Sequence, residues 1–249
     1  MPRVFGATNL ARSVNAAVAS FRNRLEGIRH RIALAATHSG RLPGAITLIG
    51  VVKTVPADVV RNVVAAGLDE LAENRVQEAE EKIAEVGRGV RWHLVGHLQR
   101  NKAARAVSLF DRVHGIDDSD LAEAISRHAM AAGRPMRALV QVNVTGEASK
   151  HGVAPRNLER LLEQILGLPG IAVDGLMSIG PREGGLDAAR RSFVETRRLR
   201  DAATARLGVV LPELSMGMSE DYEVAIEEGS TLVRIGTALF GARGGTEGT

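Results

Sequence analysis

A lysine in the first quarter of the chain has the surroundings that amine chemistry requires. Lys53 ends the apolar run AITLIGVVK, and the chain has only four lysines. A lysine amine attacks an aldehyde only when it is unprotonated, and an apolar wall such as Val51, Val52, Val55 and Pro56 favours the neutral amine. Position alone equally allows an ordinary strand-end lysine that extends to solvent or pairs with a carboxylate.

The other informative segment lies near the opposite end of the chain, at residues 215–241. It contains small-residue turns at Ser215–Ser219, Gly229–Thr231 and Gly236–Thr237. Small residues let backbone N–H groups approach an anion closely, and a helix that starts at such a turn adds the positive end of its dipole. A phosphate cradle and a strand-end lysine are together the minimum set of groups for holding pyridoxal phosphate (PLP).

Arg234 is a further candidate, between Val233 and Ile235 in the short run before the last turn. It is either a salt-bridge residue at the mouth of a barrel or a cation beside a ring nitrogen. Because arginine stays charged, that ring nitrogen would remain unprotonated, and the ring would be a weaker electron sink.

The strand and helix patterns that position these residues alternate eight times. An amphipathic helix is predicted first, over residues 8–38. Strands are predicted at 46–52, 69–72, 91–95, 111–115, 137–144, 171–178, 212–215 and 232–235, each followed by a helical stretch or a turn. This alternation predicts an α/β fold, a single (β/α)₈ TIM barrel preceded by an N-terminal helix. A doubly wound open sheet is the alternative, but a Gly-rich nucleotide turn does not follow the first strand.

The predicted barrel brings the candidate residues to one place. No Pro/Gly/Ser linker divides the chain, so residues 1–249 are expected to form a single domain with its core at about 46–241. Functional groups of TIM barrels sit at the carboxyl ends of the strands, and phosphates bind in the loops after strands seven and eight. Lys53 would end the first strand, Asn74 would follow the second, and Ser219 would follow the seventh. These side chains are therefore predicted to converge on one mouth.

Composition narrows the class of protein. The chain has no cysteine, which excludes disulfides and thiolate metal ligands and fits a cytoplasmic location. No apolar run reaches the length of a membrane span, and the first residues lack the core of a signal peptide. The net charge is only +3, and aromatic residues are not interleaved with the arginines, which argues against a nucleic-acid partner. The mixed, charged outer faces of the helices favour a monomer.

Two other groups of polar residues have ordinary structural interpretations. His93 and His97 are four residues apart, but they straddle Gly96 at a strand end. A shared metal site is therefore not expected, and both are interpreted as core or mouth histidines. The acidic residues that follow the second strand are interpreted as the solvated start of a helix: Glu73, Glu78, Glu80 and Glu81.

Several long blocks of sequence, in order, carry a resemblance to a known family. They are VVKTVP, ENRVQE, WHLVGHLQRNK, NVTGEASKHG, GLMSIGP, SMGMSEDYEVAI and GSTLVRIGTALFG. From about residue 46 to 241 the chain resembles the PLP homeostasis protein family, whose barrel is related to the N-terminal domain of alanine racemase. The resemblance implies a fold-type III PLP-binding barrel that buffers or delivers the cofactor inside the cell, without established catalysis, with PLP-dependent apo-enzymes as candidate recipients.

The resemblance also implies roles for individual residues. Lys53 matches the family lysine that forms the internal aldimine. Asn74 matches the asparagine that lies against the cofactor ring, and Arg234 matches the arginine that faces the pyridine nitrogen. The phosphate-binding positions of the family match Ser219, Gly236 and Thr237.

The chain departs from the family beside the lysine. The usual Ser-Lys-Thr-Lys-Pro is here Val-Lys-Thr-Val-Pro, so Val52 and Val55 replace a serine and a second lysine. Loss of these polar groups is expected to slow exchange of the cofactor. Lys150 is a candidate for relaying the cofactor, and a plain exposed loop lysine is the alternative.

The alternative function is a PLP-dependent amino-acid racemase. Racemisation needs two bases on opposite faces of the substrate α-carbon, and the related racemases use lysine and tyrosine. The single tyrosine, Tyr222, follows the candidate phosphate turn, and the racemases' Ala-Tyr-Gly-His run after the lysine is replaced here by Thr-Val-Pro-Ala. The chain is also expected to lack the racemases' second domain. These features favour a carrier over an enzyme.

Overall fold

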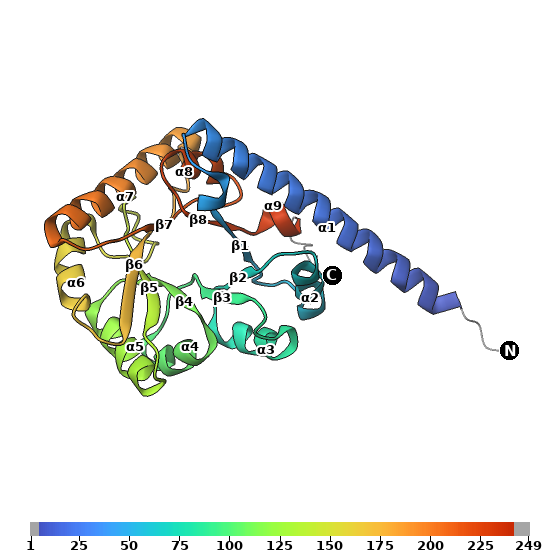
Figure 1. The fold of residues 1–249 in the computed structure, drawn as a ribbon, viewed down its shortest axis with the longest axis horizontal. Helices are drawn as coiled ribbons and strands as arrows, with labels where there is room; N and C mark the ends of the chain where they lie inside the picture. The colour runs from blue at the N-terminus through green and yellow to red at the C-terminus, as the bar shows by residue number, and fades with distance from the viewer. Residues whose placement is uncertain (1–4, 242–249) are drawn as a thin grey trace.

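Strands and helices alternate along the whole described chain (Figure 1). The computed structural model describes residues 5–241, with side chains from residue 18 onward. The strands are β1 (Thr47–Val51), β2 (Glu70–Glu73), β3 (Arg91–Leu94), β4 (Arg112–Ile116), β5 (Met136–Gln141), β6 (Ile171–Met177), β7 (Glu213–Ser215) and β8 (Leu232–Ile235). The helices are α1 (Phe5–His38), α2 (Ala57–Ala65), α3 (Val76–Val86), α4 (Ala103–Leu109), α5 (Ser119–Ala131), α6 (Leu158–Ile165), α7 (Gly185–Leu207), α8 (Tyr222–Glu227) and α9 (Thr237–Phe240).

The strands form a closed barrel in which all neighbours are parallel. They follow one another in sequence order, and β8 pairs with β1 to complete the ring. In this register Val51 lies opposite Ala72 of β2, and Ile49 lies opposite Arg234 of β8. The predicted (β/α)₈ barrel and the predicted N-terminal helix are both confirmed.

Two predictions about the elements differ from the structure. The strand predicted over 137–144 leaves the sheet after Gln141, because the Asn143 side chain accepts the N–H of Gly146 and turns the chain. Helix α4 was not predicted. The helix has only 7 residues, and two of its four buried positions are alanines, Ala103 and Ala106, so its hydrophobic pattern is weak.

Local sequence sets the ends of several helices. Pro56 directly precedes α2, where its fixed φ suits the start of a helix. The Asp118 carboxylate accepts the N–H of Leu121 (2.7 Å) and caps α5. Helix α7 ends at Gly208, whose φ of +65° is left-handed. These residues fix where α2 and α5 begin and where α7 ends.

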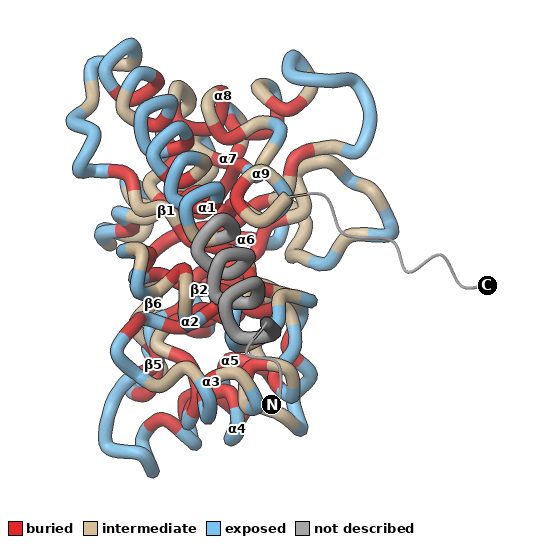
Figure 2. Tube along the Cα trace, turned by 90° about the vertical axis from the view of Figure 1, so that its right-hand side faces the viewer, coloured by how far each residue is buried: buried red, intermediate tan, exposed pale blue. Residues whose placement is uncertain are grey.

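The hydrophobic core has two layers (Figure 2). The larger lies between the outer surface of the barrel and the surrounding helices, so buried segments concentrate along the strands and the inward faces of the helices. The smaller lies inside the barrel and consists of Ile49, Ala72, Leu139, Met177 and Leu232. Because alternate strand residues face the same side, Val51 continues the interior row that begins at Ile49 and packs against this smaller group.

Helix α1 lies beside α8 and α9, where β8 meets β1 (Figure 1). Arg24 donates to the carbonyl of Leu239 (2.7 Å), and the rings of Phe21 and Phe240 stack with centroids 5.8 Å apart. These contacts fix the short helix α9 against the barrel. Within residues 5–241, no helix is both long and apolar enough to cross a membrane.

Candidate functional site

Lys53 follows β1 on a tight turn at the carboxyl end of the barrel. The N–H of Val55 donates to the carbonyl of Val52 (3.0 Å), and Thr54 Oγ1 donates to the carbonyl of Lys53 (2.5 Å). Thr54 has a φ of +64°, and it is the only described residue other than glycine with a positive φ. A β-branched residue in this conformation carries strain of about 1–3 kcal/mol, and such strain concentrates at functional sites.

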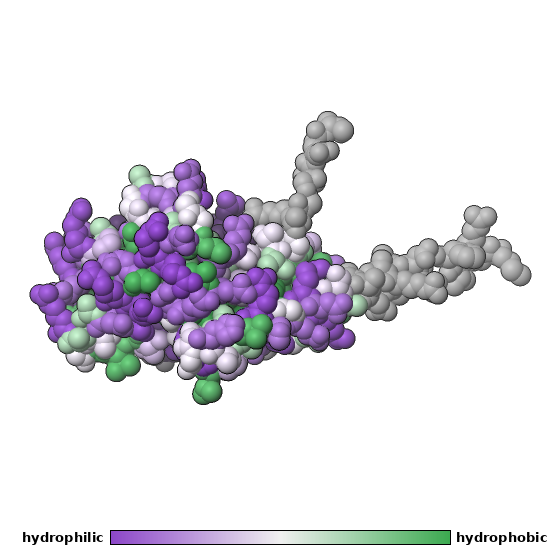
Figure 3. Space-filling view, turned by 90° about the horizontal axis from the view of Figure 1, so that it is seen from above, coloured by the Kyte–Doolittle hydropathy of each residue, from purple (hydrophilic) through white to green (hydrophobic). Residues whose placement is uncertain are grey.

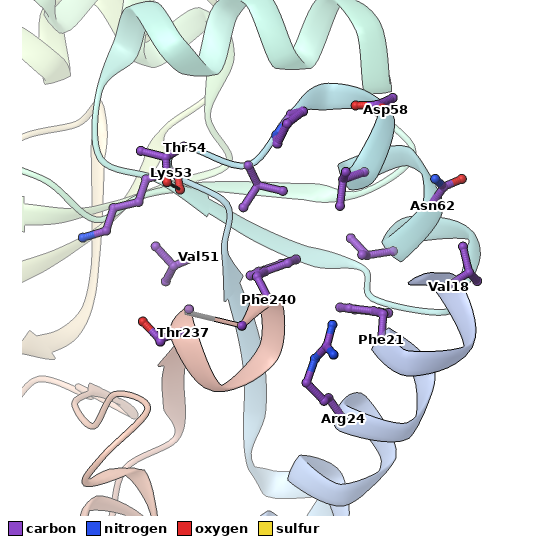
Figure 4. Close-up of a pocket in the computed structure, with 16 residues that line it drawn as sticks. Val18, Phe21, Arg24, Val51, Lys53, Thr54, Asp58, Asn62, Thr237 and Phe240 are labelled. Atoms are coloured by element: carbon purple, nitrogen blue, oxygen red, sulfur yellow. Dashed lines mark hydrogen bonds between the residues drawn. The ribbon is translucent and has the colours of Figure 1, made fainter. Parts of the chain in front are cut away.

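The Lys53 side chain borders a cavity of about 630 Å³ between β1, α1, α2 and α9. Gly236 and Thr237 line the same cavity. Figure 4 shows the lysine extending away from Phe21 and Phe240, on the side where Thr237 lies. The amine is thus directed away from the apolar end of the cavity.

The turns after β7 and β8 meet at the start of α9. Ser219 Oγ, from the turn after β7, accepts the N–H groups of Gly236 (3.3 Å) and Ala238 (3.2 Å). Thr237 is exposed at the first position of the helix. Backbone N–H groups that already converge on an oxygen atom are the donors that a phosphate oxygen needs. The two predicted halves of the anion cradle are therefore adjacent.

Arg234 lies inside the barrel and is 4% exposed. Its Nη1 donates to Ser215 Oγ (2.6 Å) and its Nη2 donates to the carbonyl of Ser178 (2.9 Å). Burial lowers the pKa of Arg234 to about 10, with Asp221 opposing the shift, so the guanidinium is charged at neutral pH. It forms no salt bridge with any described residue. A buried cation with neutral partners and unused N–H groups fits a ligand that brings an acceptor, as a pyridine nitrogen does.

Asn74 follows β2 at the level of Lys53. Val51 and Ala72 are paired across β1 and β2, and Lys53 and Asn74 each come two residues after their strand's member of that pair. Its backbone packs so closely on the next strand end that a Cβ at Gly96 would lie 2.2 Å from the Asn74 carbonyl oxygen. Only glycine fits there. Asn74 lines a separate cavity of about 260 Å³, together with His97. Among the predicted site residues, Lys53, Gly236 and Thr237 share one cavity and Ser219 joins them by hydrogen bonds.

A buried ion pair that sequence reasoning missed connects the ends of β1 and β2. Lys82 of α3 donates to the carbonyl of Val52 (2.5 Å) and to the carboxylate of Glu73, which also accepts the N–H of Asn74 (3.2 Å). The interpretation of Glu73 as solvated is wrong, because its side chain has no exposed surface. Burial raises the pKa of Glu73, and the hydrogen bond from Lys82 opposes that shift. The available signal was Lys82 itself, a lysine beside Ile83 on the apolar face of the helix.

Two expectations about neighbouring residues also need correction. Val52 is fully buried in the layer between barrel and helices, so of the two valines before Lys53 only Val51 faces the barrel interior. Alternation along β1 explains the difference. Val55 and Pro56 line the same cavity as Lys53, as predicted. Lys150 is not an exposed loop lysine: its side chain is 9% exposed, and Nζ donates to the Gly180 carbonyl (2.7 Å) and to Glu147 (2.6 Å). A relay role for Lys150 stays a prediction.

The two histidines singled out in the sequence point to different places. His93 is buried inside the barrel, as the core interpretation predicted. His97 is exposed and stacks on His151, with centroids 3.9 Å apart and planes 9° from parallel, and its Nδ1 lies 3.7 Å from Asp117 Oδ2. In-plane lone pairs of parallel rings do not converge on one point. This group of three therefore lacks the directed donor geometry of a metal centre in the conformation described.

Tyr222 lies at the start of α8 and faces α1 rather than the barrel mouth. Its side chain is buried, and the Arg31 guanidinium lies 5.3 Å from the centre of its ring. Its hydroxyl has no hydrogen-bond partner among the described residues, and burial raises its pKa. These surroundings are those of a packed core tyrosine.

Sequence and structure comparisons place this barrel in a class. The family model described as "Alanine racemase, N-terminal domain" matches residues 24–244. The structure of alanine racemase from Clostridium difficile 630 has the same fold, with a TM-score of 0.70 at 15% identity, over 92% of this chain and 58% of that chain. The chain is thus a barrel of the alanine racemase N-terminal type.

More similar proteins define the family within that class. The pyridoxal phosphate homeostasis protein of Aquifex aeolicus (strain VF5) is 42% identical over 221 residues, which cover 88% of this chain and 97% of that protein. The structure of PipY from Synechococcus elongatus PCC7942 with PLP bound has a TM-score of 0.79 and 35% identity, over 89% of this chain and all of that chain. This chain belongs to the pyridoxal phosphate homeostasis protein family.

Proposed function

We propose that this protein holds pyridoxal 5′-phosphate at the barrel mouth, covalently linked to Lys53, and acts as a buffer or carrier in intracellular PLP homeostasis. The position of Lys53 carries the proposal: it stands on a strained turn after β1 and lines the same cavity as Gly236 and Thr237 at the start of α9. The family supports it, since relatives bear the name pyridoxal phosphate homeostasis protein and the PipY structure contains PLP.

Each remaining candidate is proposed to take the role that the family resemblance implies. The N–H groups of Gly236 and Thr237 and the hydroxyl of Ser219 bind the phosphate. Arg234 presents its charged guanidinium to the pyridine nitrogen, and Asn74 lies against the ring. When bound, PLP supplies an aldehyde that condenses with primary amines and a ring that withdraws electrons. A cationic Arg234 keeps the ring nitrogen unprotonated, which weakens that withdrawal and suits a holder of the cofactor better than a catalyst.

The racemase alternative lacks support at its second base. Tyr222 packs under α1, with Arg31 over its ring, and does not face the mouth. Racemisation requires a second base on the face opposite the lysine. We therefore favour a protein that does not turn over amino acids.

We further propose that the carrier is monomeric and cytoplasmic and that its recipients are PLP-dependent apo-enzymes. The absence of cysteine suits a reducing compartment. Figure 3 shows a largely hydrophilic face with hydrophobic residues in small separate patches. The exposed large hydrophobic residues are spread over several elements, as in monomers, and include Leu42, Met130, Leu186 and Val210.

Titration with PLP, followed by absorption spectroscopy, tests the proposal in matched variants. Wild type and the control Lys102→Ala should develop the band of an amine-linked cofactor. Lys53→Ala should lack that band and retain only weak binding through the phosphate contacts. An unchanged band in Lys53→Ala would refute the attachment point. Loss of α-protons from amino acids in deuterated buffer, absent from Lys53→Ala, would instead support the racemase.

A further inference from the structure

A chain of hydrogen bonds crosses the barrel interior from Glu70 to Arg234. Glu70 Oε2 lies 2.7 Å from His93 Nε2, and His93 Nδ1 lies 2.9 Å from His114 Nε2. His114 Nδ1 lies 2.9 Å from Ser215 Oγ, which accepts from Arg234 Nη1 at 2.6 Å. The five residues come from β2, β3, β4, β7 and β8, so only the closed barrel assembles them.

All five residues of this chain of hydrogen bonds are buried. Glu70 is 6% exposed, His93 3%, Arg234 4%, and both His114 and Ser215 are fully buried. Water does not reach the middle of the chain, so each polar atom there depends on its neighbour in the chain. The outer end is anchored by Arg91, which also donates to Glu70 (2.5 Å).

The two ends define the direction of the hydrogen bonds. Burial raises the pKa of Glu70, but the hydrogen bonds from His93 and Arg91 outweigh it and leave the pKa lowered, so Glu70 is an ionised acceptor. Burial, with the nearby positive charges of Arg234 and others, lowers the pKa of His114 well below its usual range, so His114 has a single ring proton. Glu70 then takes the Nε2–H of His93.

When His93 carries its single ring proton on Nε2, the remaining protons have one arrangement. His93 Nδ1 accepts the Nε2–H of His114, and His114 Nδ1 accepts the hydroxyl proton of Ser215. The Ser215 oxygen is left to accept from Arg234. Every hydrogen bond thus points from the buried cation toward the buried anion.

We propose that His93, His114 and Ser215 are positioning residues that hold the Arg234 guanidinium in one orientation toward the cofactor ring. This inference rests on the proposed function, because it assigns a purpose to the chain at the site where the ring nitrogen would lie. The carbonyl of Ser178 holds the other terminal nitrogen (2.9 Å), and the remaining N–H groups are available to the ligand. Loss of Ser215 would leave Arg234 with one support.

Other charged groups near this chain of hydrogen bonds do not take the place of its five residues. Arg112, at the same end as Glu70, is paired with Asp174 (3.2 Å) and Glu213 (3.2 Å). Asp221 acts on Arg234 through its charge, but it accepts the N–H of Met218 (2.6 Å) rather than a guanidinium N–H. If a Ser215 substitution changes the pH dependence of the bound absorption band, the change is therefore expected to arise in the hydrogen-bonded residues themselves.

The first test uses the ligand-free protein and is independent of PLP binding. Long-range ¹H–¹⁵N correlation spectra of ¹⁵N-histidine protein report which ring nitrogens bear protons, and His93→Asn and His114→Asn provide the assignments. The expected result at neutral pH is a proton on Nε2 and none on Nδ1 for both residues. A proton on His114 Nδ1, or a cationic ring at either position, would overturn the arrangement.

The second test asks whether the chain acts on the cofactor. Ser215→Ala should weaken PLP affinity about tenfold and shift the pH dependence of the bound absorption band, whereas Ser215→Thr, which keeps the hydroxyl, should restore both. Ser126→Ala is the matched control, a buried serine on α5 whose Oγ accepts the N–H of Gly170 (3.0 Å). Wild-type affinity and pH dependence in Ser215→Ala would overturn the positioning role. A wild type that binds no PLP would refute the proposed function and its extension to Arg234. The histidine spectra of the first test would still decide where the protons lie in the chain of hydrogen bonds.

Discussion

Replacing Lys82 with methionine tests whether a buried ion pair holds the ends of β1 and β2 together. The Glu73 side chain has no exposed surface, and that of Lys82 is 12% exposed. Methionine keeps the length of the side chain but removes its charge, which leaves the carboxylate with the N–H of Asn74 (3.2 Å). Breaking one partner of a buried pair costs about 3–5 kcal/mol. At about 2–4 °C per kcal/mol for a protein of this size, Tm should fall by roughly 6–20 °C.

The loss should depend on pH in a defined direction. Burial already raises the pKa of Glu73, and the variant removes the hydrogen bond that opposes this shift. A carboxyl group with a raised native pKa contributes most to stability below its unfolded pKa, and that contribution is lost as pH rises through the native pKa. The difference in free energy of unfolding between wild type and Lys82→Met should therefore shrink from about pH 8 to about pH 5.

Urea denaturation followed by circular dichroism measures both effects, with Lys102→Met as the control for removing a lysine charge. The double variant Glu73→Gln, Lys82→Met should recover part of the loss, because no buried charge remains. A loss below about 1 kcal/mol, typical of a surface ion pair, would refute the assignment of a buried pair. A loss of stability in Lys82→Met that grows as the pH falls would also refute the assignment.

Three further substitutions address the site and its supports. Gly96→Ala would place a Cβ 2.2 Å from the carbonyl oxygen of Asn74. This variant should lower the free energy of unfolding by about 1–3 kcal/mol and weaken PLP binding in titrations. The control Gly89→Ala, where a Cβ would enter open space, should do neither. Thr54→Gly should raise the free energy of unfolding by about 1 kcal/mol in urea denaturation, because it relieves a positive φ at a small entropic cost; a loss of stability would show that the turn is unstrained. Tyr222→Phe removes a hydroxyl without a partner, so it should leave the bound absorption band unchanged and stability equal or higher by about 1 kcal/mol. A changed absorption band in Tyr222→Phe would place the tyrosine at the site.

The barrel could be predicted because its local signals agree with one another. Apolar β-rich runs such as 46–52 and 232–235 alternate with amphipathic stretches, and glycines or prolines mark many boundaries. The same rules predicted that Lys53 would stand at a strand end and that Ser219 and Gly236 would share one face. Helix α4 was missed because it is short and two of its four buried positions are alanines, which provide little hydrophobic contrast.

The interior contacts could not be predicted, because they depend on register between distant strands. Glu73 looks like part of an acidic helix start, and only the pairing of β2 with its neighbours shows that its side chain is enclosed. His93 was correctly interpreted as a core histidine, but its partners Glu70 and His114 lie on other strands. A sequence gives the alternation within each strand, whereas the level of one strand relative to the next comes from packing.

Borohydride reduction of the PLP-loaded protein, followed by peptide mass mapping, is the most direct test of the central claim. Reduction makes the link between cofactor and amine permanent, so the modified peptide identifies the attachment residue. We expect a single pyridoxyl adduct, on Lys53. An unmodified protein after incubation with PLP, or an adduct confined to Lys82, Lys102 or Lys150, would contradict it.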